Sequence, residues 1–187
     1  NIKSMAVALY SEGVMSNDRI AAFLNAAGNG ELELSEGSVY GFCKKLSECA
    51  QTSIEHLEND LLNQNVVATD ATTVTVNGEQ NYIRNFSSDT TVVYRAMKSK
   101  TIEALEKLQL LKKYTGILVH DHETALYHFG TDHAECNVHI IRYLRKNTEE
   151  TGNKWSGEMS ALLCEMNKAR KELISQEIFS FPKGTVL

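Results

Sequence analysis

The spacing of apolar residues divides the chain into a helical first third, a strand-rich middle and a helical end. Up to residue 64, apolar side chains recur at separations of three and four, the spacing of one face of a helix. They are Met5, Leu9, Ile20, Phe23, Leu24, Val39, Phe42, Leu46, Ile54, Leu57 and Leu61. Glycine-containing segments at 11–13 and 26–37 interrupt this spacing. The pattern therefore predicts several short helices, the last of them over 53–63.

The first third raises the question of DNA recognition. Two short helices joined by a glycine-containing turn can form a helix-turn-helix. The connection over 26–37 is longer than the usual three or four residues, and the second helix carries only Lys44 and Lys45 as basic residues. Both a helix-turn-helix-like reading and plain helical packing therefore stay open for residues 1–64.

At Val66 the apolar period changes to that of a strand. Val, Thr and Tyr are frequent from here to residue 97, and Asn77-Gly78 is the dipeptide of a type I′ hairpin turn. With a second turn at Ser88-Asp89, the segment predicts an antiparallel meander of three strands, over 66–76, 80–87 and 90–97.

The remaining elements alternate between helix and strand. We expect a helix over 99–114 capped by Ser99, a buried strand over 116–121, a helical turn over 123–129, a short strand over 132–138, a helix over 139–150 and a long helix from Trp155 to Leu173. Three antiparallel strands followed by helix, strand, helix, strand and helix form the α/β order of a ribonuclease-H-like fold. In this mixed sheet the first and fourth strands are parallel neighbours.

The order of elements also predicts three parts of the chain. We expect a helical segment over 1–64, a ribonuclease-H-like core over 65–148, and a helical insertion or C-terminal part over 149–187.

Composition limits the classes of protein that fit. With 187 residues, of which 42% are hydrophobic, the chain can bury a sizeable core. It contains no apolar run of membrane-spanning length and no leader-like start, so we expect a cytoplasmic protein without a membrane partner. The four cysteines are scattered without a repeated CxxC, which favours reduced thiols. A net charge of −5 argues only weakly against a nucleic-acid partner, because an acidic site and basic flanks can cancel.

Two aspartates are the main candidates for chemistry. Asp70 shares its strand parity with Val66, Val74 and Val76, so we expect its carboxylate on the side that these valines bury, where it must protonate, pair or bind a cation. Asp121 stands at the carboxyl end of the fourth strand, where open α/β sheets place their ligands. If the first and fourth strands are neighbours, the two carboxylates meet and favour Mg²⁺ or Mn²⁺.

Each aspartate also has a structural interpretation. Asp70 is followed by threonines and could be a hydrogen-bonded acid on an edge strand. Asp121 could cap the helical turn over 123–129. The expected pairing of the two acids favours a functional role for both.

The segments VVATDATTVTVNG, GILVHDHETALYHFG and HAECNVHIIRYLRK together resemble the catalytic core of the insertion-sequence transposases of the sixty-six family, in the DDE (Asp-Asp-Glu) class. The family's Asp-Glu-Thr motif corresponds to Asp70-Ala71-Thr72, and its Asp-Gly-Tyr motif to Asp121-His122-Glu123. The family's Cys-Trp-Ala-His is matched by Cys136 to His139 with Arg142 following. The resemblance covers the chain from about Met5 to Leu173.

The resemblance implies a DNA transposase that uses Mg²⁺ or Mn²⁺ to cleave and transfer DNA strands, with Asp70 and Asp121 as catalytic metal ligands. Cys136, His139 and His122 would then lie beneath or beside the site and orient Asp121 or a phosphate. The family's third acid lies in an Asn-Asn-x-Ala-Glu-Arg motif that does not occur here. We expect that acid beyond residue 187, and hence a fragment with little activity of its own. Glu158, Glu165 and Glu172 recur every seven residues and are interpreted as a solvated helix stripe.

The histidines and the basic residues near them leave further alternatives. His120 or His122, with His133, Cys136 and His139, could supply zinc ligands, although no second pair with regular spacing accompanies them. Arg142 and Lys146 follow His139 at three and seven residues, on one helix face that could meet DNA phosphates, while nearby acids favour a simple solvated helix end.

Three classes of function follow: a DNA transposase core acting on transposon ends and target DNA, another ribonuclease-H-like nuclease that hydrolyses without joining, and a non-catalytic domain for DNA binding or self-association. A homo-oligomer is compatible with all three.

Overall fold

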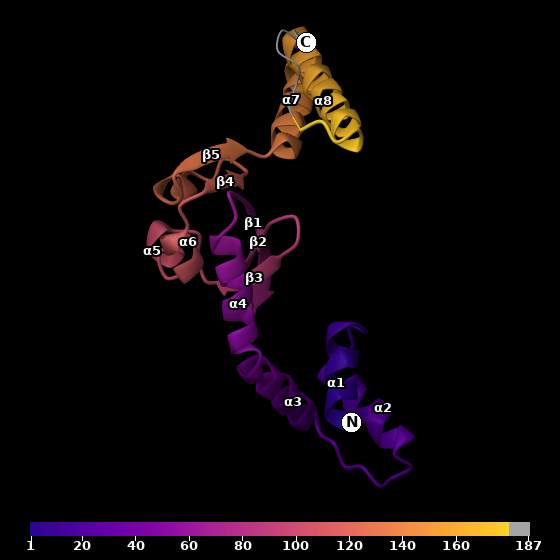
Figure 1. Cartoon of the computed structure of the whole chain (residues 1–187). Coiled ribbons are helices and arrows are strands. Elements are labelled where there is room, and N and C mark those ends of the chain that lie inside the picture. Colours follow the sequence, from indigo (N-terminus) through magenta and orange to yellow (C-terminus); the bar gives the residue numbers. More distant parts are fainter. Residues whose placement is uncertain (180–187) are drawn as a thin grey trace. The chain divides into compact units, whose positions relative to one another are not determined.

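The computed structural model describes residues 1–179 and divides the chain into two compact units, 1–59 and 60–187 (Figure 1). The predicted boundary at 64/65 lies five residues after this division, and contacts do not separate 149–187 from the core. Residues 180–187, the end of the predicted C-terminal part, lie outside the described residues. The three-part division stays a prediction.

The first unit is helical, in agreement with its apolar spacing. It contains α1 (Ile2–Ser11), α2 (Asn17–Ala27), α3 (Glu36–Cys49) and most of α4 (Gln51–Leu62). Small and branched side chains from the first three helices form its core, namely Ala6, Ile20, Ala21, Leu24 and Val39. Ser35 begins α3 with a capping box, because its hydroxyl accepts from the Ser38 amide while the Ser38 side chain accepts from the Ser35 amide. Residues 28–35 separate α2 from α3, a longer connection than a helix-turn-helix normally has.

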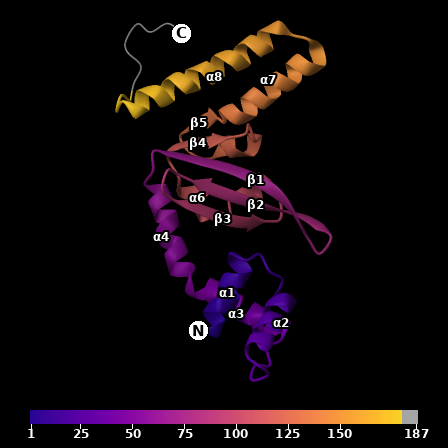
Figure 2. The same cartoon turned by 90° about the vertical axis from the view of Figure 1, so that its right-hand side faces the viewer.

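The second unit is built on a five-stranded mixed sheet. Its strands are β1 (Val66–Val76), β2 (Glu79–Ser87), β3 (Val92–Met97), β4 (Ile117–His120) and β5 (Asp132–Glu135). The strands lie in the order β3-β2-β1-β4-β5, with β1, β4 and β5 parallel and the first three antiparallel (Figure 2). This confirms the ribonuclease-H-like arrangement in which the first and fourth strands are neighbours.

The turn at Asn77-Gly78 sets the register of β1 and β2. Both residues have positive φ, 52° and 80°, as a type I′ turn requires. Val76 therefore pairs with Glu79, and counting back along both strands pairs Asp70 with Asn85. The turn thus determines which side chain lies beside the first aspartate.

The two faces of the sheet differ in how they are covered. One face, here called the closed face, carries Val67, Thr69, Arg84, Phe86 and Leu118, all of them buried. Beside it lie α5 (Ile102–Leu105), α6 (Gln109–Lys113) and the 3₁₀ helix η1 (Thr124–His128), which bury apolar side chains of their own, Leu105, Leu110, Leu111 and Leu126 (Figures 1 and 2).

The opposite face, here called the open face, carries Ala68, Asp70, Asn85, Val119 and Asp121. Their placement follows from strand alternation and from the pairing of Ala68 with Val119 and of Asp70 with Asn85. None of these five side chains is fully buried. The chemistry predicted from the sequence therefore lies on the less covered face.

The expectation that Asp70 points to the buried side of β1 is wrong. Asp70 is exposed, and Val66 and Val76, which share its parity, are 46% and 49% exposed. Val67 and Thr69 are buried instead, because the helices after β3 cover their face. Valines occur at both parities of this strand, so alternation alone does not identify the buried face.

The single helix expected over 99–114 is also wrong. The segment forms two short helices, α5 and α6, and Leu108 between them has extended backbone. Thr101, and not Ser99, caps α5 by accepting from the Ala104 amide at 3.4 Å. The break allows Leu105, Leu110 and Leu111 all to be buried, which one continuous helix would place on different sides.

The described chain closes with a helical hairpin of α7 (Asn137–Thr151) and α8 (Lys154–Ser175), joined at Gly152 with φ 69°. The Thr148 and Ser156 hydroxyls lie 2.7 Å apart across the pair. Within residues 1–179, no helix combines the length and apolar character that crossing a bilayer requires.

Candidate active site

A small pocket of about 100 Å³ lies on the open face, where the paired part of β1 and β4 ends and α7 begins. Four of its lining residues were singled out in the sequence: Asp70, Asp121, Cys136 and His139. The others are Ala68, Thr69, Asn85 and Val119. Residues from β1, from β2, from the end of β4 and from the start of α7 thus meet at one point.

Strand register explains why the two aspartates meet. β1 and β4 pair in parallel through Val66 with Ile117, Val67 with Leu118 and Ala68 with Val119. Two residues further on come Asp70, on β1, and Asp121, the first residue after β4, on the face that Ala68 and Val119 share. Adjacent strands lie about 4.8 Å apart, so two carboxylates at equivalent positions are near neighbours.

The pocket contains polar atoms without protein partners. Asp121 Oδ1 and His139 Nδ1 are both buried and make no hydrogen bond. One Asp70 oxygen accepts from the Ala71 amide at 2.7 Å, which orients that carboxylate. A buried carboxylate oxygen without a donor is costly unless a cation or a proton satisfies it. The donor set therefore fits a hard divalent cation held between Asp70 and Asp121.

Asn85 is a pocket residue that the sequence analysis missed. Its side-chain oxygen accepts from the Asp70 amide at 2.7 Å, so it is tied to the strand that carries the first acid. The signal was present in the sequence, because the two-residue turn at Asn77-Gly78 sets Asp70 opposite Asn85.

Cys136 and His139 bring α7 to the pocket. Cys136 is the N-cap residue of α7, and its amide donates to the His120 carbonyl at 2.8 Å, which ties the helix start to the end of β4. His139 lies in the first turn of α7. Both residues thus line the pocket together with Asp121, and their role in orienting it stays a prediction.

The model of the Transposase IS66 family matches residues 3–181, nearly the whole chain. The chain belongs to this family. A search of curated proteins finds no match.

In this transposase-family chain, a histidine follows the second aspartate where the family pattern has glycine. His122 has φ 68°, the left-handed region that glycine enters without strain. The conformation turns the chain after β4, so that Asp121 lies on the open face while Glu123 reaches Arg84 on the closed face. A histidine thus adopts here a backbone conformation that glycine enters more easily.

His122 itself does not line the pocket, and its role in orienting Asp121 stays a prediction. Its Nδ1 is paired with Glu135, and Tyr127 donates to the same Glu135 oxygen at 3.0 Å. The hydrogen bonds from His122 and then Tyr127 lower the pKa of the Glu135 carboxyl below its usual value. The pKa of Tyr127 is raised, first by desolvation and then by its bond to Glu135.

The alternative zinc site is not assembled. Among residues 1–179, no group of three or more His, Cys, Asp or Glu side chains is placed to hold a metal ion. His120 Nε2 lies 3.2 Å from His133 Nδ1, whereas Cys136 and His139 line the pocket on the open face. Burial and then the neighbouring His133 lower the pKa of His120. The four histidine and cysteine candidates are thus divided between two places.

The remaining predicted residues lie on the surface of the helical hairpin. Arg142 and Lys146 are both exposed on α7, and Lys146 Nζ lies 3.6 Å from Glu150. Glu158, Glu165 and Glu172 on α8 are exposed, in agreement with their interpretation as a solvated stripe.

A buried ion pair beneath the pocket escaped the sequence analysis. Arg84 is 0% exposed, and its Nη2 donates to both oxygens of Glu123 at 2.6 and 2.7 Å. Its Nη1 donates to Thr69 Oγ1 at 3.2 Å, while Nε is buried without a partner. We call Arg84, Thr69 and Glu123 the Arg84 clamp. Arg84 and Glu123 are 39 residues apart, so only the folded sheet brings them together.

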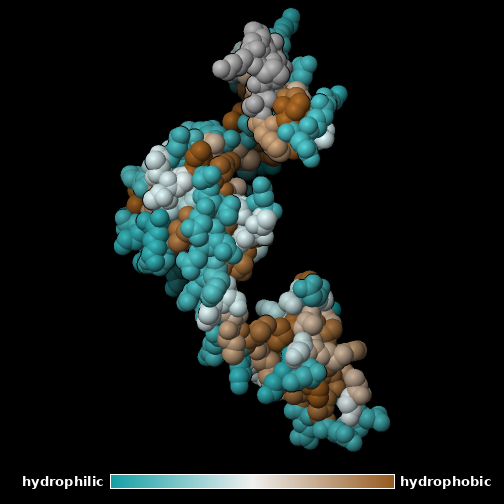
Figure 3. Space-filling view, viewed as in Figure 1, coloured by the Kyte–Doolittle hydropathy of each residue, from teal (hydrophilic) through white to brown (hydrophobic). Residues whose placement is uncertain are grey.

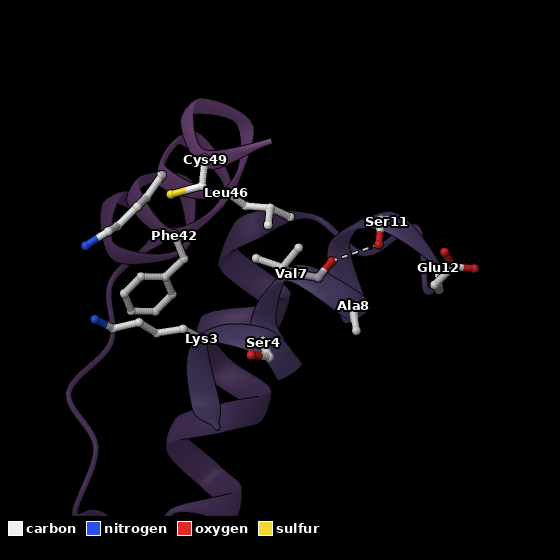
Figure 4. A pocket seen from close by; sticks show the side chains of 10 residues that line it. Lys3, Ser4, Val7, Ala8, Ser11, Glu12, Phe42, Leu46 and Cys49 are labelled. Carbon is white, nitrogen blue, oxygen red and sulfur yellow. Dashed lines mark hydrogen bonds between the residues drawn. The ribbon is translucent and has the colours of Figure 1, made fainter. Parts of the chain in front are cut away.

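A second hollow, in the helical unit, has a different chemistry. It is an apolar groove of about 470 Å³ between α1 and α3, with Val7, Phe42 and Leu46 along it and Lys3 beside the Phe42 ring (Figure 4). Lys45 also lines it. Lys3 Nζ lies 5.6 Å from the centre of the Phe42 ring. Figure 3 shows hydrophobic residues gathered on the surface of these helices. The groove contains Glu12 as its one acid, so it lacks the paired carboxylates of the open-face pocket.

Proposed function

We propose that this domain is the catalytic core of a DNA transposase that cleaves and transfers DNA strands with the aid of Mg²⁺ or Mn²⁺. One observation carries the proposal: two aspartates from adjacent parallel strands line one pocket, and an oxygen of Asp121 is buried there without a partner. Membership of the Transposase IS66 family supports DNA as the substrate.

Asp70 and Asp121 are the residues that would hold the cation. The bound cation would supply charge neutralisation at the attacked phosphodiester and help to activate a water or a 3′ hydroxyl. Asp70 is held for this by the Ala71 amide, and the strand that carries it is held by Asn85. His139 Nδ1, which has no protein partner, can exchange a hydrogen bond with Asp121 or with a phosphate oxygen.

The proposal includes a third carboxylate supplied from outside this pocket. Two aspartates and no glutamate line it among the described residues. Glu123, although only two residues after Asp121, is engaged by Arg84 on the other face. We therefore propose that this pocket has little activity until a third carboxylate joins the two aspartates.

Basic residues on α7 are proposed to contact the DNA backbone. α7 begins at the pocket with Cys136 and His139, and Arg142 follows one turn later on the exposed surface. The positively charged side chain of Arg142 would lie beside a DNA backbone that enters the pocket. Lys146 lies one turn further along α7. We propose that its ammonium group leaves Glu150 and binds a DNA phosphate when DNA is present.

The decisive experiment uses the intact protein and DNA that carries the ends of its element. We expect strand cleavage only with Mg²⁺ or Mn²⁺, reduced to background by Asp70→Asn and by Asp121→Asn. Asp132→Asn, at an exposed acid on β5 outside the pocket, is the matched control and should cleave normally. Undiminished cleavage by either pocket variant would contradict the proposal, and cleaved ends that are never joined would favour a hydrolytic nuclease instead.

A further inference from the structure

The open-face pocket has its aspartates on β1 and after β4, and the same two segments are connected from the closed face by Arg84. Thr69 is the residue before Asp70, and Glu123 is the second residue after Asp121. Arg84 binds both, through Nη1 to Thr69 and through Nη2 to Glu123. A single guanidinium therefore connects the neighbours of the two acids.

Hydrogen bonds also connect the Arg84 clamp to Asn85, the next residue of β2. Thr69 Oγ1 donates to the Asn85 carbonyl at 2.8 Å, and Asn85 is the residue after Arg84. The Asn85 side chain in turn accepts from the Asp70 amide. Hydrogen bonds thus run from Glu123 through Arg84 and Thr69 to Asn85 and Asp70, and connect the closed face to the pocket.

The position after β4 requires such a support. β4 ends at His120, so no strand pairing holds Asp121. The next residue, His122, has the left-handed φ of 68°, which a non-glycine residue adopts only when its surroundings impose it. The side chain of Glu123 is 12% exposed and receives two hydrogen bonds from Arg84, which fixes the chain directly after Asp121.

We propose that Arg84 is a positioning residue for the two-aspartate pocket. It sets the separation of Asp70 and Asp121 from the opposite face of the sheet, and it acts through Thr69 and Glu123 without touching the cation. This inference rests on the proposed function only in so far as the pocket binds a divalent cation. A planar guanidinium suits the role because its fork binds two partners in a fixed geometry, which a lysine ammonium does not.

The test uses a double variant, Arg84→Met with Glu123→Gln, which removes the clamp without leaving a buried charge unpaired. We expect it to fold, to exchange amide hydrogens faster over residues 119–124, and to bind Mn²⁺ about 10-fold or more weakly, the usual cost of losing a group that orients a metal ligand. Hydrogen exchange by mass spectrometry and calorimetric Mn²⁺ titration measure the two effects. Arg84→Lys should fall between the double variant and the unaltered protein in both.

Two further variants separate positioning from general stability. Val93→Ala removes a buried side chain of the closed face on β3, away from the clamp, so it should lower the unfolding temperature and leave Mn²⁺ affinity unchanged. Thr69→Val removes the hydroxyl that accepts from Arg84 and donates to the Asn85 carbonyl, and it serves if the double variant does not fold; it should weaken Mn²⁺ binding while the ion pair between Arg84 and Glu123 persists.

The outcomes are distinguishable. Normal Mn²⁺ affinity in the double variant overturns the inference, whether or not residues 119–124 exchange faster. If the unaltered protein does not bind Mn²⁺, the proposed function fails. Hydrogen exchange then tests by itself whether the Arg84 clamp holds the segment after β4. Unchanged exchange over residues 119–124 in the double variant overturns that role.

Discussion

The two faces of the sheet use the same strands for opposite purposes. On the closed face, the polar groups of Arg84 and Glu123 are buried together and bind each other. On the open face, Asp121 Oδ1 and His139 Nδ1 are buried and bind nothing within the protein. Arg84 Nε is also buried without a partner, so an unpaired polar atom does not by itself distinguish the two faces. The difference is that the main acid of the closed face is bound by a cation of the protein, whereas the buried oxygen of Asp121 lies in a pocket beside a second aspartate.

The largest expected effect is a difference in stability loss between two variants, each of which removes a charged side chain from one face of the sheet. Arg84→Met leaves the largely buried Glu123 carboxylate with Lys100 Nζ, 3.5 Å away, as a weaker partner and should cost about 3 kcal/mol of unfolding free energy. Asp121→Asn removes a charge that has no protein partner and should change stability by less than about 1 kcal/mol without metal. Urea denaturation of both variants measures the difference. Equal losses would show that the two faces are not distinct in this sense.

A matched pair of valines on β1 tests the apolar part of the comparison. Val67 is 0% exposed on the closed face, and its neighbour Val66 is 46% exposed on the other. Val67→Ala should destabilise the protein by about 2 kcal/mol, because it leaves a cavity, and Val66→Ala by less than about 0.5 kcal/mol. Thermal or urea unfolding measures the stability of both variants. A larger loss at Val66 would indicate that a partner or another part of the chain covers the open face.

The smallest effect concerns the residue at which the chain crosses between the faces. His122 has a left-handed backbone, so a β-branched side chain there is strained, whereas glycine is not. His122→Val should be less stable than His122→Gly by about 1 to 2 kcal/mol. Both variants lose the bond to Glu135, so their difference in urea midpoint isolates the backbone. Equal midpoints would contradict the strained turn.

Local features of the fold were predictable wherever short-range chemistry dominates. β1 has the predicted bounds of 66–76, and the Asn77-Gly78 turn has the predicted conformation. The long helix expected from Trp155 to Leu173 is α8, two residues longer at its C-terminal end. These elements depend on backbone preferences and on the apolar period, which neighbouring residues carry by themselves.

The candidate site was predictable in part. Asp70 and Asp121 were chosen because strand order places the first and fourth strands side by side, and the structure has them in one pocket with Cys136 and His139. Asn85 was missed although the hairpin register implied it. His122 does not line that pocket and is paired with Glu135, so its predicted role beside Asp121 stays a prediction.

By itself, then, the sequence determined the order of the elements, the register of the first hairpin and the two strand ends where acids stand. Only the tertiary structure decided which face of β1 is buried, because valines at both parities leave the alternation ambiguous until α5 and α6 cover one side. It also decided the pairing of Arg84 with Glu123. Two charges 39 residues apart become partners only when the sheet brings them together in a place that excludes water.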